Sequence, residues 1–148
     1  DEVILPSYTF VTTGSSFART GCKLRYCDIQ RHNLMPSFRQ IKKCVTKKTK
    51  AIVPVHFTGY MTNMPELTKV SKKYKIPIVE DACQSILGSI NKKKSGLWGD
   101  LGTFSLHPLK NINVWSDGGV IVTNKKDYYK NPKKIRAPLP ENPKLIQN

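Results

Sequence analysis

Short apolar runs alternate along the first half of the chain with segments whose apolar residues recur at helical spacing. The apolar runs at residues 3–5, 23–27, 50–55 and 76–79 predict strands. The segments at residues 8–19, at 36 to about 44 and from 64 onward predict helices. This order is typical of an α/β fold, a three-layer sandwich in which helices flank both faces of a mainly parallel sheet.

The residues at the expected boundaries fit these elements. Ser7 can cap the first helix, because its hydroxyl can accept a hydrogen bond from an unpaired amide of the first turn. Gly21 ends that helix at a position where a left-handed backbone is favourable. Pro36 suits the start of the second helix.

Beyond residue 82 the regular alternation stops. The remaining chain predicts a hairpin or turn at 88–96, strands at 102–106 and 120–123, and a helix at 125–135. Residues 136–148 contain three prolines and no periodicity, which predicts a loose or extended tail.

Several polar residues directly follow predicted strands. Right-handed crossovers place the carboxyl ends of parallel strands along one edge of the sheet, where ligands of such sheets bind. The candidates for this edge are Pro6-Ser7, Asp28, His56 and Asp81. Asp81 follows a buried-looking strand, so it is either a helix cap or a carboxylate aimed at a ligand. A loop histidine such as His56 is more often structural than catalytic.

A second group of polar residues follows the predicted strand at 102–106. Ser105 and Lys110 are five residues apart, and a hydroxyl and an ammonium at that exit could bracket an anionic, carbonyl-bearing ligand. A single lysine is more often a surface residue, so spacing alone leaves both interpretations open. His107 lies between the two and has the same ambiguity as His56.

The chain is strongly basic, with 25 Lys+Arg against 10 Asp+Glu, a net charge of +15 and 148 residues in all. A charge of this size can indicate nucleic-acid binding. Twenty of the cations are lysines, however, and bidentate recognition of phosphate and guanine favours arginine. We therefore interpret most of the charge as solvated surface, with an anionic substrate, an anionic membrane surface or a nucleic acid as the alternatives.

Cysteine spacing and apolar content exclude further classes. The four cysteines form no C-x-x-C pair and no zinc pattern, which predicts free buried thiols and no metal site. No window has the ~18–20 apolar residues that a membrane span needs, and the acidic first residues do not resemble a signal peptide. We expect a cytoplasmic protein. The first residue is not Met, which indicates a fragment or a trimmed product.

Five segments in order carry a family resemblance, at residues 6–11, 49–56, 79–84, 104–111 and 117–124. They resemble the successive motifs of the DegT/DnrJ/EryC1/StrS family of sugar aminotransferases, which use pyridoxal 5'-phosphate (PLP) and have fold type I. The resemblance implies part of the large domain of the aspartate-aminotransferase-like architecture. It makes residues 1–135 a partial PLP-binding large domain and leaves 136–148 as a Pro-rich tail.

The resemblance also implies a role for individual residues. Lys110 matches the lysine that bonds to PLP, and Asp81 matches the carboxylate that faces the pyridine nitrogen. Gln84 matches a residue beside the cofactor ring, Ser105 a hydroxyl that binds the phosphate, and Phe10 the aromatic side chain that stacks on the ring. His56 and His107 lie in matching motifs and are possible neighbours of the site without an assigned role.

The implied reaction is transamination in amino-sugar and cell-surface polysaccharide biosynthesis. An amino-acid donor, glutamate by family habit, gives its amino group to a nucleotide-linked keto sugar. Dehydratase-like relatives have histidine in place of the lysine, so Lys110 favours transamination. The full-length protein is expected to be a homodimer, with no nucleic-acid partner.

This chain also differs from the family pattern. The family is longer at both ends, so we expect this chain to be the central part of the cofactor domain, poorly active alone. Cys83 and Ser85-Ile86-Leu87 stand where small residues or His-Gly are commoner. Two other functions remain as alternatives: a non-catalytic basic module that binds nucleic acid or another polyanion, and a regulatory relative that binds PLP without turnover.

Overall fold

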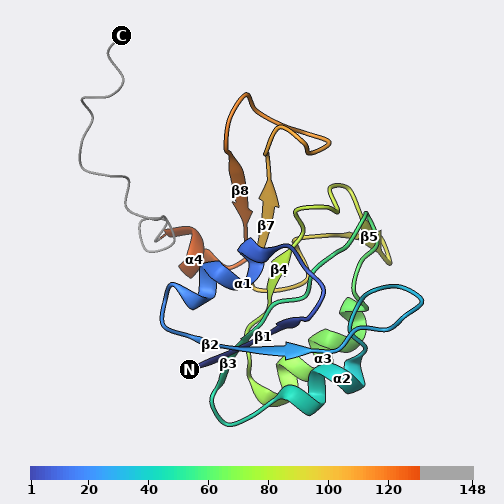
Figure 1. Ribbon diagram of the computed structural model, residues 1–148, viewed down its shortest axis with the longest axis vertical. Coiled ribbons are helices and arrows are strands. Elements are labelled where there is room, and N and C mark those ends of the chain that lie inside the picture. The colour runs from blue at the N-terminus through green and yellow to red at the C-terminus, as the bar shows by residue number, and fades with distance from the viewer. Residues whose placement is uncertain (131–148) are drawn as a thin grey trace.

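The computed structural model describes residues 1–130, which form four helices and eight strands (Figure 1). The helices are α1 (Val11–Ala18), α2 (Phe38–Cys44), α3 (Met64–Tyr74) and α4 (Lys126–Lys130). The strands are β1 (Glu2–Pro6), β2 (Lys23–Cys27), β3 (Thr49–Ile52), β4 (Val79–Asp81), β5 (Ser89–Ile90), β6 (Lys93–Lys94), β7 (Leu101–Ser105) and β8 (Gly119–Val122).

The main strands form one mixed sheet. Two three-stranded parts, β2-β1-β3 and β4-β7-β8, are joined by parallel bridges from Ile52 to Ile78 and from Val55 to Asp81. Every pairing is parallel except that of β7 with β8. The prediction of a mainly parallel sheet is therefore confirmed. β5 and β6 form a separate antiparallel hairpin.

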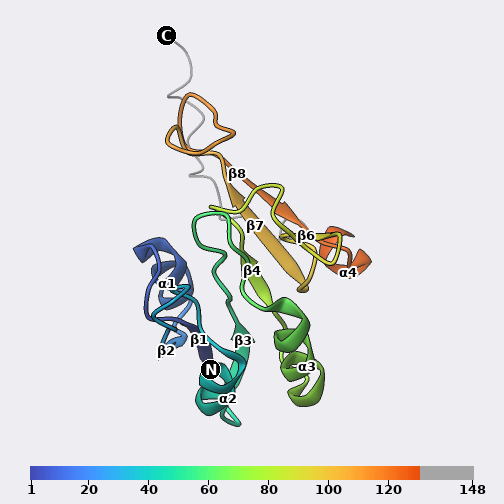
Figure 2. The same cartoon turned by 90° about the vertical axis from the view of Figure 1, so that its right-hand side faces the viewer.

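Helices cover both faces of this sheet (Figure 2). In β1, Val3 and Leu5 point to the side of α1 and pack with Phe17, whereas Ile4 points to the other side. Ile4 packs in a core with residues of α2 and α3, among them Ile41 and Leu67. β2 lies on one side of β1, and the following strands lie on the other side. Because crossovers between parallel strands are right-handed, this change of direction places α1 on the face opposite to α2 and α3. The three-layer prediction is confirmed.

Helix α1 begins later than the sequence predicts. Ser7 does not cap it, because the Ser7 N–H donates to the Cys27 carbonyl oxygen at 2.9 Å and extends the pairing of β1 with β2. The helix starts at Val11, and Phe10 precedes it without a side-chain cap. The expected helix from residue 8 is thus wrong at its start. The shift leaves Thr9 and Phe10 in the loop at the carboxyl end of β1.

Prolines move two strand boundaries. The run at 50–55 gives only β3, since Pro54 has no N–H for the sheet ladder. The run at 76–79 contains Pro77, and the strand β4 begins at Val79 and includes Asp81. The predicted helix at 125–135 is observed as α4, and its last residues, like the predicted tail at 136–148, lie outside the described residues.

All four cysteines are free. Cys27 is buried, and Cys22, Cys44 and Cys83 are half-buried, so the prediction of buried thiols is right for Cys27 alone. Within residues 1–130, no helix has the length and apolar character to cross a membrane.

A fully buried carboxylate ties several segments to β4. Glu80 Oε2 accepts hydrogen bonds from His56 Nε2 and from the Gly96 N–H, both at 2.9 Å. Glu80 Oε1 accepts from the Gly99 N–H at 2.6 Å. His56 Nδ1 accepts from the Thr62 N–H at 3.3 Å, so His56 carries its proton on Nε2 and donates it to Glu80.

Removal of this carboxylate should destabilise the fold. In Glu80→Ala the Gly96 and Gly99 amides and the His56 ring lose their buried partner, which should lower the free energy of unfolding by about 3 kcal/mol. Urea denaturation measures the change. The control Glu66→Ala, at the exposed first turn of α3, should cost about 0.5 kcal/mol. Equal losses in the two variants would contradict a structural role for Glu80.

Candidate active site

A cavity of about 350 Å³ lies at the carboxyl ends of β4 and β7. The loop before α1 contributes Thr9 and Phe10, and the end of β4 contributes Asp81. The other walls come from the segments that follow β4 and β7 and precede β8, and they include Cys83, Gln84, Ser105, His107, Leu109, Lys110, Asp117 and Gly118. The structure thus brings together six of the seven predicted site residues: Phe10, Asp81, Gln84, Ser105, His107 and Lys110.

The carboxylate of Asp81 is held through both of its oxygens. The Thr13 hydroxyl donates to Oδ2 at 2.7 Å, and the Cys83 N–H donates to Oδ1 at 3.2 Å. The backbone of Asp81 is fixed as well, because its N–H donates to the Pro54 carbonyl oxygen and its own carbonyl accepts from the His56 N–H. Within residues 1–130 no helix begins directly after Asp81, so it is not a helix cap, and it lines the first cavity. A role of this carboxylate toward a ligand stays a prediction.

The loop after β7 holds Lys110 in a hydrogen-bonded turn. The Ser105 hydroxyl accepts from the His107 N–H at 3.2 Å, and His107 Nδ1 accepts from the Leu109 N–H at 3.2 Å. The Lys110 N–H donates to the His107 carbonyl oxygen at 2.8 Å. His107 therefore organises the turn that presents Lys110 beside Ser105. Figure 1 shows this loop at the far end of β7 and β8.

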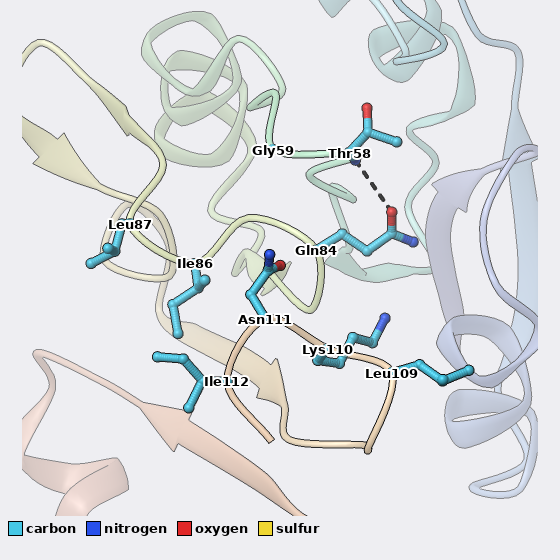
Figure 3. Close-up of a pocket in the computed structure, with 9 residues that line it drawn as sticks. All are labelled: Thr58, Gly59, Gln84, Ile86, Leu87, Leu109, Lys110, Asn111 and Ile112. Atoms are coloured by element: carbon cyan, nitrogen blue, oxygen red, sulfur yellow. Dashed lines mark hydrogen bonds between the residues drawn. The ribbon is translucent and has the colours of Figure 1, made fainter.

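A second cavity of about 660 Å³ lies on the other side of Lys110. It shares Gln84, Leu109 and Lys110 with the first cavity. Its further walls are Thr58, Gly59, Ile86, Leu87, Asn111 and Ile112. Figure 3 shows the Lys110 side chain extending toward Gln84, whose Oε1 accepts from the Thr58 N–H at 3.2 Å. Lys110 thus lies on the boundary between two adjoining spaces.

His56 does not line either cavity. Its side chain is fully buried and bonds to Glu80. The reason is the alternation of side chains along an extended chain: Val55 lines the first cavity, so the next residue points to the opposite face. The structure therefore does not place the His56 side chain beside the site, where the sequence made it a possible neighbour.

Two residues that matter for this geometry were not singled out from the sequence. Thr13 donates to Asp81, and Glu80 anchors the strand from the other face. Thr9 and Thr13 lie four residues apart, a spacing that puts two hydroxyls on one side of the helix predicted over residues 8–19. That spacing was a usable signal for Thr13. For Glu80 the signal was an acidic residue inside a run that the sheet buries.

The chain is similar in sequence to known proteins. The model of the DegT/DnrJ/EryC1/StrS aminotransferase family matches residues 1–139. A pleiotropic regulatory protein of Geobacillus stearothermophilus is 38% identical over 139 residues, which cover 93% of this chain and 37% of that protein. A UDP-N-acetyl-3-dehydro-alpha-D-glucosamine 3-aminotransferase of Acidithiobacillus ferrooxidans is 35% identical over 123 residues, or 83% of this chain and 33% of that protein.

The fold of the chain is also similar to that of solved aminotransferase-family structures. The crystal structure of NtdA from Bacillus subtilis with bound cofactor PMP superposes with a TM-score of 0.79 at 32% identity. The superposition covers 86% of this chain and 28% of that chain. The chain spans about a third of the length of the curated relatives it matches, 37% and 33% for the two above.

The Cys83 thiol tests the electrostatics of the first cavity. Burial, followed by the neighbouring Asp81 charge, raises the pKa of the Cys83 thiol to about 12. At pH 8 about one such thiol in 10⁴ is ionised, so iodoacetamide should alkylate Cys83 about 10³-fold more slowly than free cysteine. Peptide mass spectrometry measures the rate, which should rise about tenfold per pH unit from pH 7 to pH 10.

In urea all four cysteines should react at the rate of free cysteine, which serves as the control. A Cys83 rate in the folded protein that levels off above pH 9 would contradict the assigned pKa.

Proposed function

The chain belongs to the DegT/DnrJ/EryC1/StrS aminotransferase family, and from that premise we propose that it forms part of a PLP-dependent sugar aminotransferase. The proposed reaction transfers an amino group from an amino acid, glutamate, to a nucleotide-linked keto sugar in amino-sugar and cell-surface polysaccharide biosynthesis. The observation that supports it most strongly is the meeting of Asp81, Ser105 and Lys110 around one cavity. They come from two segments far apart in sequence, the end of β4 and the end of β7 with its following loop.

The side chains around the first cavity fit PLP. A carboxylate suits a protonated pyridine nitrogen, a hydroxyl suits a phosphate oxygen, and an aromatic ring can stack on the cofactor ring. Asp81, Ser105 and Phe10 line the cavity and supply these three groups, and the Gln84 amide lies beside Lys110. Bound PLP supplies an aldehyde that bonds to amines and a ring that accepts an electron pair from the substrate carbon.

Lys110 is the proposed catalytic residue. Its amine Nζ would hold the cofactor through the cofactor aldehyde until a donor amine displaced it, and Nζ would then move a proton between substrate carbon and cofactor carbon. Both tasks require an amine that reaches cofactor and substrate. Lys110 lines both cavities, and this position supports contact with a cofactor in one cavity and a substrate in the other.

The second cavity is the proposed substrate side of the site. Ile86, Leu87 and Ile112 offer apolar surface there, while Asn111 and Thr58 offer polar groups. Sugars present both apolar ring faces and hydroxyls, so such a wall suits a sugar ring. The name of the Acidithiobacillus ferrooxidans relative, a UDP-sugar 3-aminotransferase, supports a nucleotide-linked substrate for this chain.

A regulatory protein that binds PLP without turnover is the second candidate. The Geobacillus stearothermophilus relative is named a pleiotropic regulatory protein, and its identity of 38% favours this alternative. Both candidates use the same cavity, and turnover distinguishes them. The homodimer and the cytoplasmic location stay predictions from the sequence.

Attachment of PLP to Lys110 is the direct test. Purified chain is mixed with PLP and reduced with borohydride, which makes a lysine–PLP bond permanent, and peptides are then read by mass spectrometry. The label is expected on Lys110 and should be lost in Lys110→Ala. The control Lys69→Ala, on the exposed side of α3, should keep it.

Transamination is measured in the same variants with glutamate and nucleotide-linked keto sugars. If the chain turns over, Lys110→Ala should lower the rate at least about 10³-fold, because general acid–base catalysis and attachment are both lost. Turnover would refute the regulatory candidate, whereas label on Lys110 without turnover fits both candidates, because this chain is expected to be poorly active alone. Label spread over surface lysines would refute the proposed cofactor site.

A further inference from the structure

We propose that Thr13 is a positioning residue that holds the Asp81 carboxylate toward the cofactor ring. This inference rests on the proposed function, because it is the PLP nitrogen that Asp81 would meet. Thr13 does not line the cavity and would not contact PLP. It acts through Asp81, which the Thr13 hydroxyl contacts at 2.7 Å across 68 residues of sequence.

The hydrogen bonds have only one consistent direction. A hydroxyl has a single proton, and Thr13 donates that proton to Asp81 Oδ2. The 2.8 Å contact between the Thr9 and Thr13 hydroxyls must then run from Thr9 to Thr13. With the Cys83 N–H on Oδ1, both carboxylate oxygens have a fixed donor, and rotation of the carboxylate would break one of them.

Thr13 also connects Asp81 to Phe10, the aromatic residue of the cavity wall. The Thr13 N–H donates to the Phe10 carbonyl oxygen at 3.1 Å, so the two residues share one helical turn. Phe10 and Asp81 are proposed to contact the face and the edge of the same planar ring. The bond from Thr13 to Asp81 therefore sets the angle between these two contacts.

The close packing of α1 keeps the Thr13 hydroxyl within reach. Thr13 is 6% exposed, and the next residue is Gly14. A Cβ at Gly14 would lie 3.2 Å from Leu24 Cδ1 and 3.3 Å from the Tyr26 hydroxyl, so α1 packs closely against β2 at this turn. Among the described residues, the contact to Asp81 is the one side-chain hydrogen bond that joins α1 to β4.

Two substitutions separate positioning from packing. Thr13→Val keeps the shape and removes the hydroxyl, whereas Thr13→Ser keeps the hydroxyl and removes a methyl group. Each variant is titrated with PLP, and both the dissociation constant and the visible circular dichroism of bound PLP are recorded. Visible dichroism reports how rigidly the ring is held. Thr68→Val, on α3, is the control.

Thr13→Val is expected to weaken PLP binding about tenfold and to reduce the visible dichroism of bound PLP, since a hydrogen bond to a charged group is lost. Thr13→Ser should restore both, and Thr68→Val should match the wild type. The unfolding of each variant without PLP is measured in parallel.

Three results would overturn the inference. One is a Thr13→Val variant that binds PLP within twofold of the wild type with unchanged dichroism. Another is a Thr13→Ser variant as impaired as Thr13→Val, with losses that follow stability alone. The third is a wild-type chain that takes up no PLP at Lys110, which would overturn the proposed function as well. The wild-type titration therefore distinguishes a failure of the proposed function from a failure of the role of Thr13.

Discussion

The burial of the Glu80 carboxylate is the constraint on which the rest of the site depends. A charged group in a protein core is tolerated when its oxygens are hydrogen-bonded, and here His56, Gly96 and Gly99 supply those bonds. The three donors come from the loop after β3 and from the segment between β6 and β7. The hydrogen bonds to this one carboxylate therefore hold both segments against β4. They also fix the position of the strand at the residue before Asp81.

Side chains alternate along β4, so the buried structural carboxylate and the proposed site carboxylate lie on opposite faces of the sheet. Glu80 points to the face that carries the hairpin, so Asp81 points to the face that α1 crosses. The same rule sends Val55 to the cavity and His56 to the core. Helix α1 crosses the second face close enough for Thr13 to reach Asp81, and its first turn places Phe10 at the cavity.

The alternation of strands and helices could be predicted from apolar periodicity, because each strand is short, apolar and separated from the next by a helical segment. The edge position of Asp81 followed from the geometry of parallel sheets, and the pairing of Ser105 with Lys110 followed from their spacing after a predicted strand. The same geometry made His56 an edge candidate, but its side chain is buried. The start of α1 could not be predicted, since Ser7 serves the sheet ladder through its backbone instead of capping through its side chain. The partners of Glu80 and Thr13 depend on contacts between distant segments, which periodicity does not report. The chemical roles of the cavity residues stay predictions.

A crystal structure of the chain grown with PLP would show whether the first cavity holds the cofactor. Density for PLP is expected in the cavity bounded by Phe10, Asp81 and Ser105, joined to Lys110 Nζ. The ring nitrogen should lie within hydrogen-bonding distance of Asp81, and the Thr13 hydroxyl should still contact the other side of that carboxylate. PLP bound elsewhere, or in this cavity with its nitrogen away from Asp81, would contradict the account.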